Sequence, residues 1–247
     1  MKNCLKVVAV IILIALGFSG CENSSSPSTS VNNRVIVCFG DSLTEGYGAA
    51  AQDEIDKLNS YPAFLEKKVS LPVVNAGITG NTTAQGLDRL KKDVLSEKPQ
   101  VVIILLGAND FMQIIPPAAH TKENLKLILK KVKSKDRKVY LASFIGDSQW
   151  EAKYIEKIPE LLVQKGVPDE VIASIGGGDP ERFITDRLES YKKVFEDLKK
   201  ENPNLKFISN IWKDIKEEHM SDPIHPNAAG YEIMANNIFR ELDLADL

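Results

Sequence analysis

The sequence predicts an α/β protein, a three-layer sandwich in which helices cover both faces of a five-stranded parallel sheet. Along the chain, short apolar runs alternate with segments whose apolar residues recur at helical spacing, the pattern of a parallel α/β sheet. One run, 101–106, consists of six consecutive aliphatic residues. Such a run is typical of a central strand that is buried on both faces.

Each predicted strand is a short apolar run. The first run stops abruptly at Gly40, where an aspartate and a serine follow. A turn would explain the glycine and the aspartate, but it would not explain the serine. The predicted strands are 35–39, 72–74, 101–106, 138–144 and 205–209.

The predicted helices lie between these strands, and the last one closes the chain. In 82–95, three apolar residues form one stripe at helical spacing. The helix over 121–132 is expected to be capped by Thr121, with Asn124 three residues on. The Lys- and Glu-rich segment 191–201 is interpreted as a solvated helix face. The predicted helices are 60–69, 82–95, 121–132, 191–201 and 227–242.

Residues 145–187 do not fit this regular alternation. They contain scattered apolar residues and a glycine-rich run at 176–178, and they predict a helical insert before the last strand. Two interpretations remain open. The insert is either a decoration of the fold or a lid or wall of a substrate pocket, since long inserts on α/β sheets often border sites.

The first residues of the chain have the pattern of an export signal. After a short cationic start, 7–18 is an almost unbroken apolar stretch, too short for a membrane span and suited to a secretory signal. Phe18-Ser19-Gly20-Cys21 resembles the lipobox of bacterial lipoproteins, in which the cysteine is lipidated. We therefore expect a signal peptide at 1–20 and a lipid anchor at Cys21. The alternative is an ordinary cleaved signal peptide.

The following segment, 21–33, is rich in Ser, Asn and Pro and is predicted to be a flexible tether. The globular domain is then 34–247, exported and held at the membrane surface of a bacterial cell envelope. Of the three cysteines, only Cys38 would remain as a free thiol in the mature domain, so no internal disulfide is expected. Cys38 lies in an apolar strand, where it is expected to pack in the core.

Composition excludes one broad class of partner. The chain has 247 residues, 43% of them hydrophobic and 26% charged, with a formal net charge of −3. This balance is that of a globular domain with a sizeable core. A net negative charge gives no electrostatic support for nucleic-acid binding, and the sequence predicts no particular oligomeric state.

Polar loops follow four of the predicted strands. The carboxyl ends of parallel strands meet at one edge of a sheet, where sites form. These loops should therefore bring Ser42, Asp222 and His225 together. A serine hydroxyl needs a neighbouring base to act as a nucleophile, and a histidine three residues after an aspartate can be that base. We expect the Asp222–His225 contact to form within a helical turn. The loops are 40–42, 75–82, 107–110 and 222–227.

The same loops supply hydrogen-bond donors for an oxyanion, the charge that develops when a hydroxyl attacks an ester. The candidates are the backbone N–H groups of Ser42 and Gly80 and the side-chain amide of Asn109. Asp110 is expected to support its loop. The other two histidines, His120 and His219, are expected to be incidental.

These motifs resemble the conserved blocks of the GDSL, or SGNH, hydrolases. Phe39-Gly40-Asp41-Ser42-Leu43 is similar to block I, and blocks II, III and V are matched in order by Gly80 in NAGITGNTT, Asn109 in GAND, and DPIH at 222–225. Within the family, the chain looks most similar to the thioesterase I, lysophospholipase L1 and arylesterase branch.

The resemblance implies a flavodoxin-like fold and a role for each site residue. Ser42 would be the nucleophile, His225 the base and Asp222 its orienting partner. Ser42, Gly80 and Asn109 would form the oxyanion hole. The implied activity is hydrolysis of carboxylic esters or thioesters without a metal or organic cofactor. Substrates in the family include lysophospholipids, acyl thioesters, aryl esters and acetylated sugars.

Two other functions remain open at this point. The first is a metal-dependent phosphoesterase with Asp41, Asp110, Asp222 and His225 as ligands, although such sites usually need more histidines than this chain has. The second is a catalytically silent binding lipoprotein of the cell envelope, because a hydrolase fold does not guarantee hydrolysis.

Overall fold

The structure, a computed structural model, describes residues 34–113, 117–146, 157, 163, 168–174 and 179–243. The predicted signal peptide, Cys21 and the tether lie outside the described residues, and so does most of the predicted insert.

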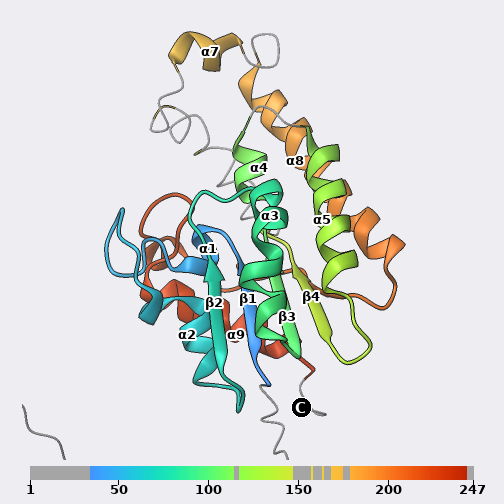
Figure 1. Cartoon of the computed structure of the whole chain (residues 1–247). Helices are drawn as coiled ribbons and strands as arrows, with labels where there is room; N and C mark the ends of the chain where they lie inside the picture. Colours follow the sequence, from blue (N-terminus) through green and yellow to red (C-terminus); the bar gives the residue numbers. More distant parts are fainter. Residues whose placement is uncertain are drawn as a thin grey trace, which may run out of the picture. The chain divides into compact units, whose positions relative to one another are not determined.

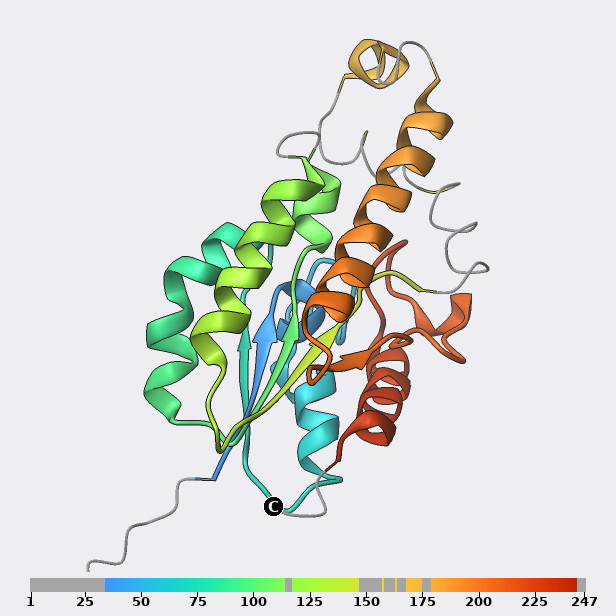
Figure 2. The same cartoon turned by 90° about the vertical axis from the view of Figure 1, so that its right-hand side faces the viewer.

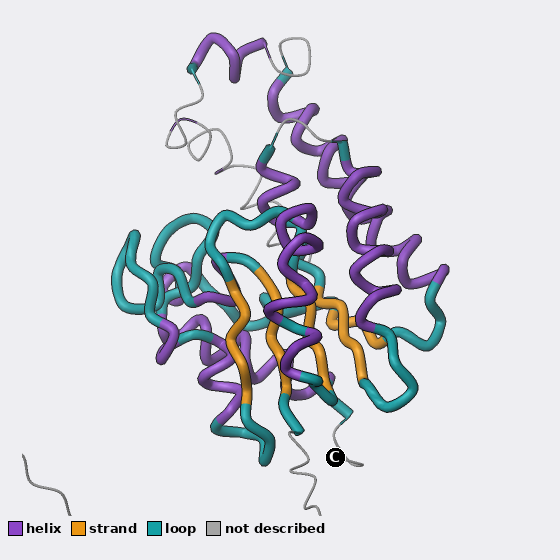
Figure 3. Tube along the Cα trace, in the orientation of Figure 1, coloured by secondary structure: helices purple, strands orange, loops and turns teal. Residues whose placement is uncertain are grey.

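The centre of the domain is a five-stranded parallel sheet in the order β2-β1-β3-β4-β5. Figure 3 shows the strands of this sheet in orange between the helices. In register, Ile36 of β1 lies between Val73 of β2 and Val101 of β3. Every residue of β1 and β3 is buried, as expected for central strands. The predicted fold class is confirmed. The strands are β1 (Ile36–Gly40), β2 (Val73–Gly77), β3 (Val101–Leu105), β4 (Lys138–Ala142) and β5 (Lys206–Ile208).

Two helical layers enclose this sheet. Helices α3 (Thr83–Asp93), α5 (Ala118–Val132) and α8 (Pro180–Glu201) cover one face, and α2 (Tyr61–Glu66) and α9 (Ala228–Glu241) cover the other (Figure 2). The shorter helical elements are α1 (Ser42–Glu45), η1 (Lys57–Asn59), η2 (Leu95–Glu97), α4 (Ala108–Met112), α7 (Asp169–Ser174) and η4 (Glu217–His219). None of the helices in the described ranges is both long and apolar enough to cross a lipid bilayer.

The predicted cap of one helix is wrong. Helix α5 begins at Ala118 after Pro117, three residues before the predicted start at Thr121. The Thr121 side chain is fully buried, and its hydroxyl contacts Tyr191 and donates to Asp110. The threonine hydroxyl therefore makes tertiary hydrogen bonds and does not cap the helix. Strand β2 also differs from its prediction, because it continues through Asn75 to Gly77.

The interpretation of 191–201 as a solvated face is also incorrect. Along α8, Tyr191, Val194, Phe195 and Leu198 are buried, and the lysines and glutamates alternate with this stripe. The helix is therefore amphipathic. It begins at Pro180, capped by the Asp179 side chain, so the last part of the predicted insert is the start of α8. These first turns extend past the carboxyl ends of the strands (Figure 1).

Candidate active site

The carboxyl ends of the strands border a cavity of about 140 Å³. Loops after β1, β2, β3 and β4 contribute to its walls, together with the segment that follows β5. The described residues that line it are Ser42, Leu43, Tyr47, Thr79, Gly80, Ala108, Asn109, Met112, Phe144, Trp212, Ile224 and His225.

Ser42 reaches this cavity because β1 ends in a close-packed turn. A Cβ on Gly40 would lie 2.6 Å from the carbonyl oxygen of Leu105, so only glycine fits between β1 and β3 at this point. Asp41 then caps the short helix α1 by accepting from the backbone N–H of Leu43. Ser42 is the first residue of that helix, with 7% of its surface exposed.

His225 comes from the segment between β5 and α9 and meets Ser42 across the cavity. Its Nε2 lies 2.9 Å from Ser42 Oγ, and its Nδ1 lies 2.6 Å from Asp222 Oδ2. The ring of Tyr47 packs against the imidazole at a centroid distance of 4.5 Å. The structure therefore brings Ser42, His225 and Asp222 into one hydrogen-bonded chain, although 183 positions separate the serine from the histidine.

The Asp222–His225 contact does not form in a helical turn, as the spacing had predicted. Instead, Asp222 Oδ1 accepts from the backbone N–H groups of Ile224 and His225, each at 2.8 Å. This is an Asx-type turn, in which the carboxylate folds back onto its own backbone. Burial raises the pKa of Asp222, but hydrogen bonds from His225 and Ile224 outweigh it, so the pKa lies below its usual value. The carboxylate therefore stays ionised beside the imidazole.

The three residues that were predicted to supply oxyanion donors also line the cavity. Within the described part of the chain, neither the Ser42 nor the Gly80 backbone N–H donates to another group. Gly80 has a φ of +78°, a conformation that L side chains rarely adopt, and a Cβ there would meet nothing within 4 Å. The space beside the Gly80 Cα is therefore open. Asn109 lines the same cavity from α4, and its Nδ2 donates to the carbonyl of Asn81 at 3.1 Å.

A match to a protein-family model identifies the family of this chain. The model of the GDSL-like Lipase/Acylhydrolase family matches residues 38–233. The chain belongs to this family. The match includes every predicted site residue of the globular domain, from Ser42 to His225.

Curated relatives of this GDSL-like hydrolase carry the names of ester-cleaving enzymes. Esterase TesA of Pseudomonas aeruginosa is 31% identical over 58% of this chain and 70% of its own length. Thioesterase 1/protease 1/lysophospholipase L1 of Escherichia coli K12 is 31% identical over 54% of this chain and 64% of its own length. Acetylxylan esterase of Geobacillus stearothermophilus is 24% identical over 84% of this chain and 93% of its own length.

Solved structures share the fold. A GDSL-family lipolytic protein from Desulfitobacterium hafniense superimposes with a TM-score of 0.61 at 22% identity, covering 84% of this chain and 99% of that one. The flavodoxin-like arrangement expected from the motifs is therefore the fold of the GDSL-like hydrolase.

The acidic residues considered as metal ligands are engaged separately in this GDSL-like hydrolase. Asp41 caps α1, and Asp110 accepts from the backbone N–H and hydroxyl of Thr83. Asp110 thus supports its loop, as expected. Across the described ranges, no three His, Cys, Asp or Glu side chains gather in a group that could hold a metal ion. Cys38 is fully buried in β1, and burial raises the pKa of its thiol to about 12.

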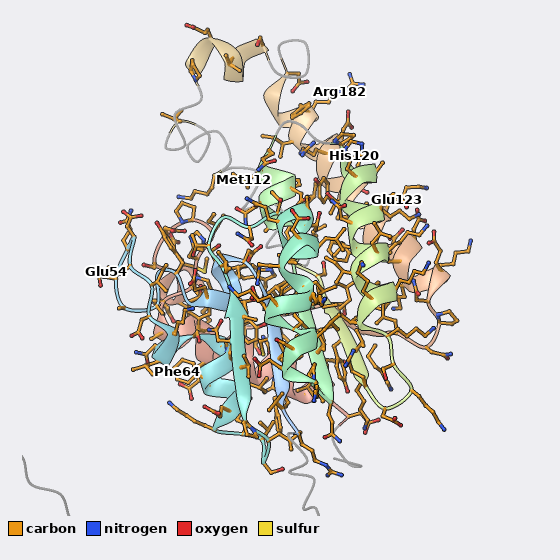
Figure 4. The ribbon with its side chains drawn as sticks, in the orientation of Figure 1. Glu54, Phe64, Met112, His120, Glu123 and Arg182 are labelled. Carbon is orange, nitrogen blue, oxygen red and sulfur yellow. The ribbon has the colours of Figure 1, made fainter. Side chains whose placement is uncertain are left out.

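The apolar wall of the cavity was not predicted from the sequence. Phe144 follows β4, and Trp212 follows β5 and donates from Nε1 to the Phe144 carbonyl at 2.7 Å. Their positions after strands, at the same edge of the sheet, were a usable signal. Figure 4 shows Met112, another lining residue, at the end of α4, and His120, which is exposed on α5.

Asp41 gives the GDSL-like hydrolase a predicted pH dependence of stability. Burial, helped by the nearby Asp110 carboxylate, raises the pKa of Asp41 to about 7 despite the opposing charge of Arg89. In the unfolded chain the pKa would be about 3.9. The folded state binds this proton more tightly, so the free energy of unfolding should fall as pH rises through this window. The slope should reach about 1.4 kcal/mol per pH unit.

Urea denaturation between pH 5 and pH 7.5 measures this slope in the wild type and in Asp41→Asn. Asparagine keeps the N-cap oxygen but removes the titration. We expect the variant to lose the part of the slope that comes from Asp41, so that its stability relative to wild type improves as pH rises. Parallel pH profiles for the two proteins would contradict the prediction.

Proposed function

We propose that the protein is a serine esterase that hydrolyses carboxylic esters or thioesters through an acyl-Ser42 intermediate. One observation carries the proposal: Ser42 Oγ, His225 Nε2, His225 Nδ1 and Asp222 Oδ2 are joined by contacts of 2.9 and 2.6 Å at the wall of a cavity. A hydroxyl in contact with an imidazole, which is itself oriented by a carboxylate, is the arrangement that activates serine for acyl transfer.

In the first half of the reaction, Ser42 Oγ attacks the acyl carbonyl carbon while His225 Nε2 takes the hydroxyl proton. The carbonyl oxygen becomes an oxyanion, which the backbone N–H groups of Ser42 and Gly80 and the amide of Asn109 stabilise. Collapse of this intermediate breaks the bond to the leaving alcohol or thiol. His225 donates its proton to that leaving group, and the acyl group remains on Ser42.

In the second half, water enters beside His225, which now accepts a proton from the water as its oxygen attacks the acyl carbon. The same donors stabilise a second oxyanion. The bond from the acyl carbon to Ser42 Oγ breaks, the serine recovers its proton from His225, and the carboxylic acid leaves. Asp222 remains ionised throughout and stabilises the protonated imidazole.

The proposed substrates are acyl esters and thioesters of the lysophospholipase, thioesterase and arylesterase type. The mainly apolar residues around Ser42, including Met112, Phe144 and Trp212, suit an acyl or aryl group. The alternative is a carbohydrate acetylesterase, favoured by the alignment with an acetylxylan esterase that extends over 84% of this chain.

A substrate panel tests the activity and separates these alternatives. It compares p-nitrophenyl esters of increasing acyl length with lysophosphatidylcholine, an acyl-coenzyme A and acetylated xylan. We expect turnover of p-nitrophenyl esters that EDTA does not inhibit. Preference for acetylated xylan over every other substrate would favour the carbohydrate esterase. p-Nitrophenyl phosphate completes the panel: its hydrolysis, lost with EDTA and restored by a divalent cation, would support the metal-dependent phosphoesterase. No turnover of any ester, this phosphoester included, would support the silent binding protein.

We also propose that the enzyme is exported and anchored to a membrane through lipid at Cys21. The support is the sequence pattern of 1–21 and the polar tether that follows it. Metabolic labelling with an alkyne fatty acid should mark the wild type and not Cys21→Ser. Equal labelling of both proteins, or of neither, would contradict the anchor.

A further inference from the structure

Arg89 of α3 binds the ends of two strands from behind the cavity. Its Nη2 donates to the Gly40 carbonyl at 2.7 Å, and its Nη1 donates to the Ala76 carbonyl at 2.8 Å. Its Nε donates to Asn81 Oδ1 at 2.7 Å. The side chain is only 12% exposed, and its guanidinium lies over the ring of Phe39 at 4.3 Å. Asp93, one turn further along α3, pairs with Nη1 at 3.1 Å.

Two of these acceptor residues are close in sequence to the residues that supply the oxyanion donors. Gly40 precedes Ser42 by two residues, and Asn81 directly follows Gly80. The carbonyl of Asn81 in turn accepts from Asn109 Nδ2 at 3.1 Å. One guanidinium therefore connects the three loops that carry the oxyanion donors, two of them directly and the third through Asn81.

The loop after β2, residues 78–82, contains a turn in which the Asn81 N–H donates to the Ile78 carbonyl at 3.1 Å, and Thr82 forms a capping box with Gln85 of α3. Within the turn, Gly80 adopts a positive φ. The loop also donates to α1 from the Thr79 N–H to Glu45 Oε2 at 2.7 Å, and to β1 from the Ile78 N–H to the Gly40 carbonyl at 3.1 Å. The planar guanidinium holds Gly40, Ala76 and Asn81 at once with donors in a fixed fork, a geometry that the ammonium of lysine on its flexible stem does not fix.

We propose that Arg89 is the positioning residue of the oxyanion hole: by bonding Gly40, Ala76 and Asn81, it sets the geometry of the donors on Ser42, Gly80 and Asn109. The inference rests on the proposed esterase function. Arg89 touches no reacting atom, so its effect on the reaction is indirect. Misplacing a donor by a fraction of its hydrogen-bond length weakens stabilisation of the transition state more than it weakens substrate binding.

Arg137 provides a matched control at the opposite end of the sheet. Both arginines are partly buried, and Arg137 also donates to backbone carbonyls, from Nε to Pro99 at 2.9 Å and from Nη1 to Val132 at 2.6 Å. These contacts precede β3 and β4, far along the strands from the cavity. Each arginine donates to two backbone carbonyls, which are the bonds that the control matches, but only those of Arg89 lie at the donor loops.

The experiment compares Arg89→Lys, Arg137→Lys, Asn109→Ala and the double variant Arg89→Lys/Asn109→Ala, using the p-nitrophenyl ester that the wild type turns over fastest. Two quantities are measured: the kcat and KM of hydrolysis, and the inhibition constant of an alkylboronic acid. The boronic acid forms a tetrahedral adduct with serine and so reports on binding of a transition-state-like group. Circular dichroism and Tm establish that each variant is folded at the assay temperature.

We expect Arg89→Lys to lower kcat by about 10- to 100-fold and to weaken boronic acid binding by a similar factor, with KM changed by less than about twofold. Arg137→Lys should change kcat by less than about twofold, even if it lowers Tm as much as Arg89→Lys does. Asn109→Ala should lower kcat by at least about tenfold. In the double variant, the loss should be smaller than the product of the single losses, because Arg89 acts partly through Asn109.

Equal kcat values for Arg89→Lys and Arg137→Lys would overturn the inference, as would fully independent effects of Arg89→Lys and Asn109→Ala. If Arg89→Lys does not fold, Asn81→Ala removes the same link from a loop position. It should lower kcat at least about threefold with KM unchanged, and an unchanged kcat would also overturn the inference. A wild type without esterase turnover would overturn the proposed function, and the inference with it. Active wild type with unaffected Arg89 and Asn81 variants would overturn the inference alone.

Discussion

Ser42→Ala is expected to lower the kcat for p-nitrophenyl butyrate by about 10⁶-fold, the scale seen when a serine hydrolase loses its nucleophile. Among the described hydroxyl groups that line the cavity, only that of Ser42 is hydrogen-bonded to the imidazole of His225. Without that oxygen no acyl intermediate forms. What remains is the weak stabilisation that the donors give to direct attack by water.

The matched control for this variant is Ser190→Ala. Ser190 lies exposed on α8, where its hydroxyl donates to the Asp186 carbonyl of the preceding turn, so its loss should leave kcat within about twofold of wild type. The two variants should share the circular dichroism spectrum of the wild type. Residual activity of Ser42→Ala above about 1% of wild type, in protein free of contaminating esterase, would contradict the assignment of Ser42 as the nucleophile.

Asp222→Asn is expected to lower kcat by about 10⁴-fold while leaving KM nearly unchanged. The carboxylate of Asp222 accepts from His225 Nδ1 and from two backbone N–H groups. An amide in its place brings two N–H donors next to groups that are themselves donors, namely His225 Nδ1 and the two backbone N–H groups. Where one of them faces Nδ1, the imidazole proton is held on Nε2, and Nε2 can no longer accept the proton of Ser42.

The measurement is a pH profile of kcat/KM for wild type and Asp222→Asn. In the wild type, the low pKa of Asp222 keeps its carboxylate ionised down to the acidic end of the assay range. Protonation of Asp222 should therefore cause no loss of rate above about pH 5. Asp186→Asn, an exposed substitution on α8, is the control. A variant that keeps more than about a tenth of wild-type kcat would remove Asp222 from the proposed mechanism.

The fold and the central contacts of the site could be predicted because they follow from periodic patterns. The aliphatic run 101–106 identified a central strand, and the rule that parallel strands end at one edge placed Ser42 beside His225 without any distance information. That rule would also have found Phe144 and Trp212, which follow β4 and β5. Neither side chain is a candidate nucleophile, base or oxyanion donor, so the chemistry of the residues alone did not indicate them.

Other features depend on partners that leave no periodic signal in the sequence. Two acceptors of Arg89 are backbone carbonyls, and a carbonyl is present at every residue, so the sequence position of Arg89 does not reveal them. Thr121 was predicted to cap a helix because threonine is a common N-cap residue. Its actual partners, Asp110 and Tyr191, come from other elements and leave no local signal in the sequence. Tyr191 was placed on a solvated face because charged residues surround it, although the helical period puts it on the apolar stripe of α8.

The central claim is that Ser42 forms a covalent intermediate with the help of His225, without a metal ion. The most direct measurement is peptide mapping by mass spectrometry after incubation with a fluorophosphonate, whose phosphorus is attacked by an activated serine with loss of fluoride. Trypsin should release residues 35–57 as one peptide that contains Ser42. We expect one phosphonyl group on Ser42 in the wild type, with or without EDTA, and none in Ser42→Ala. A wild type that hydrolyses esters while this peptide stays unlabelled would contradict the account.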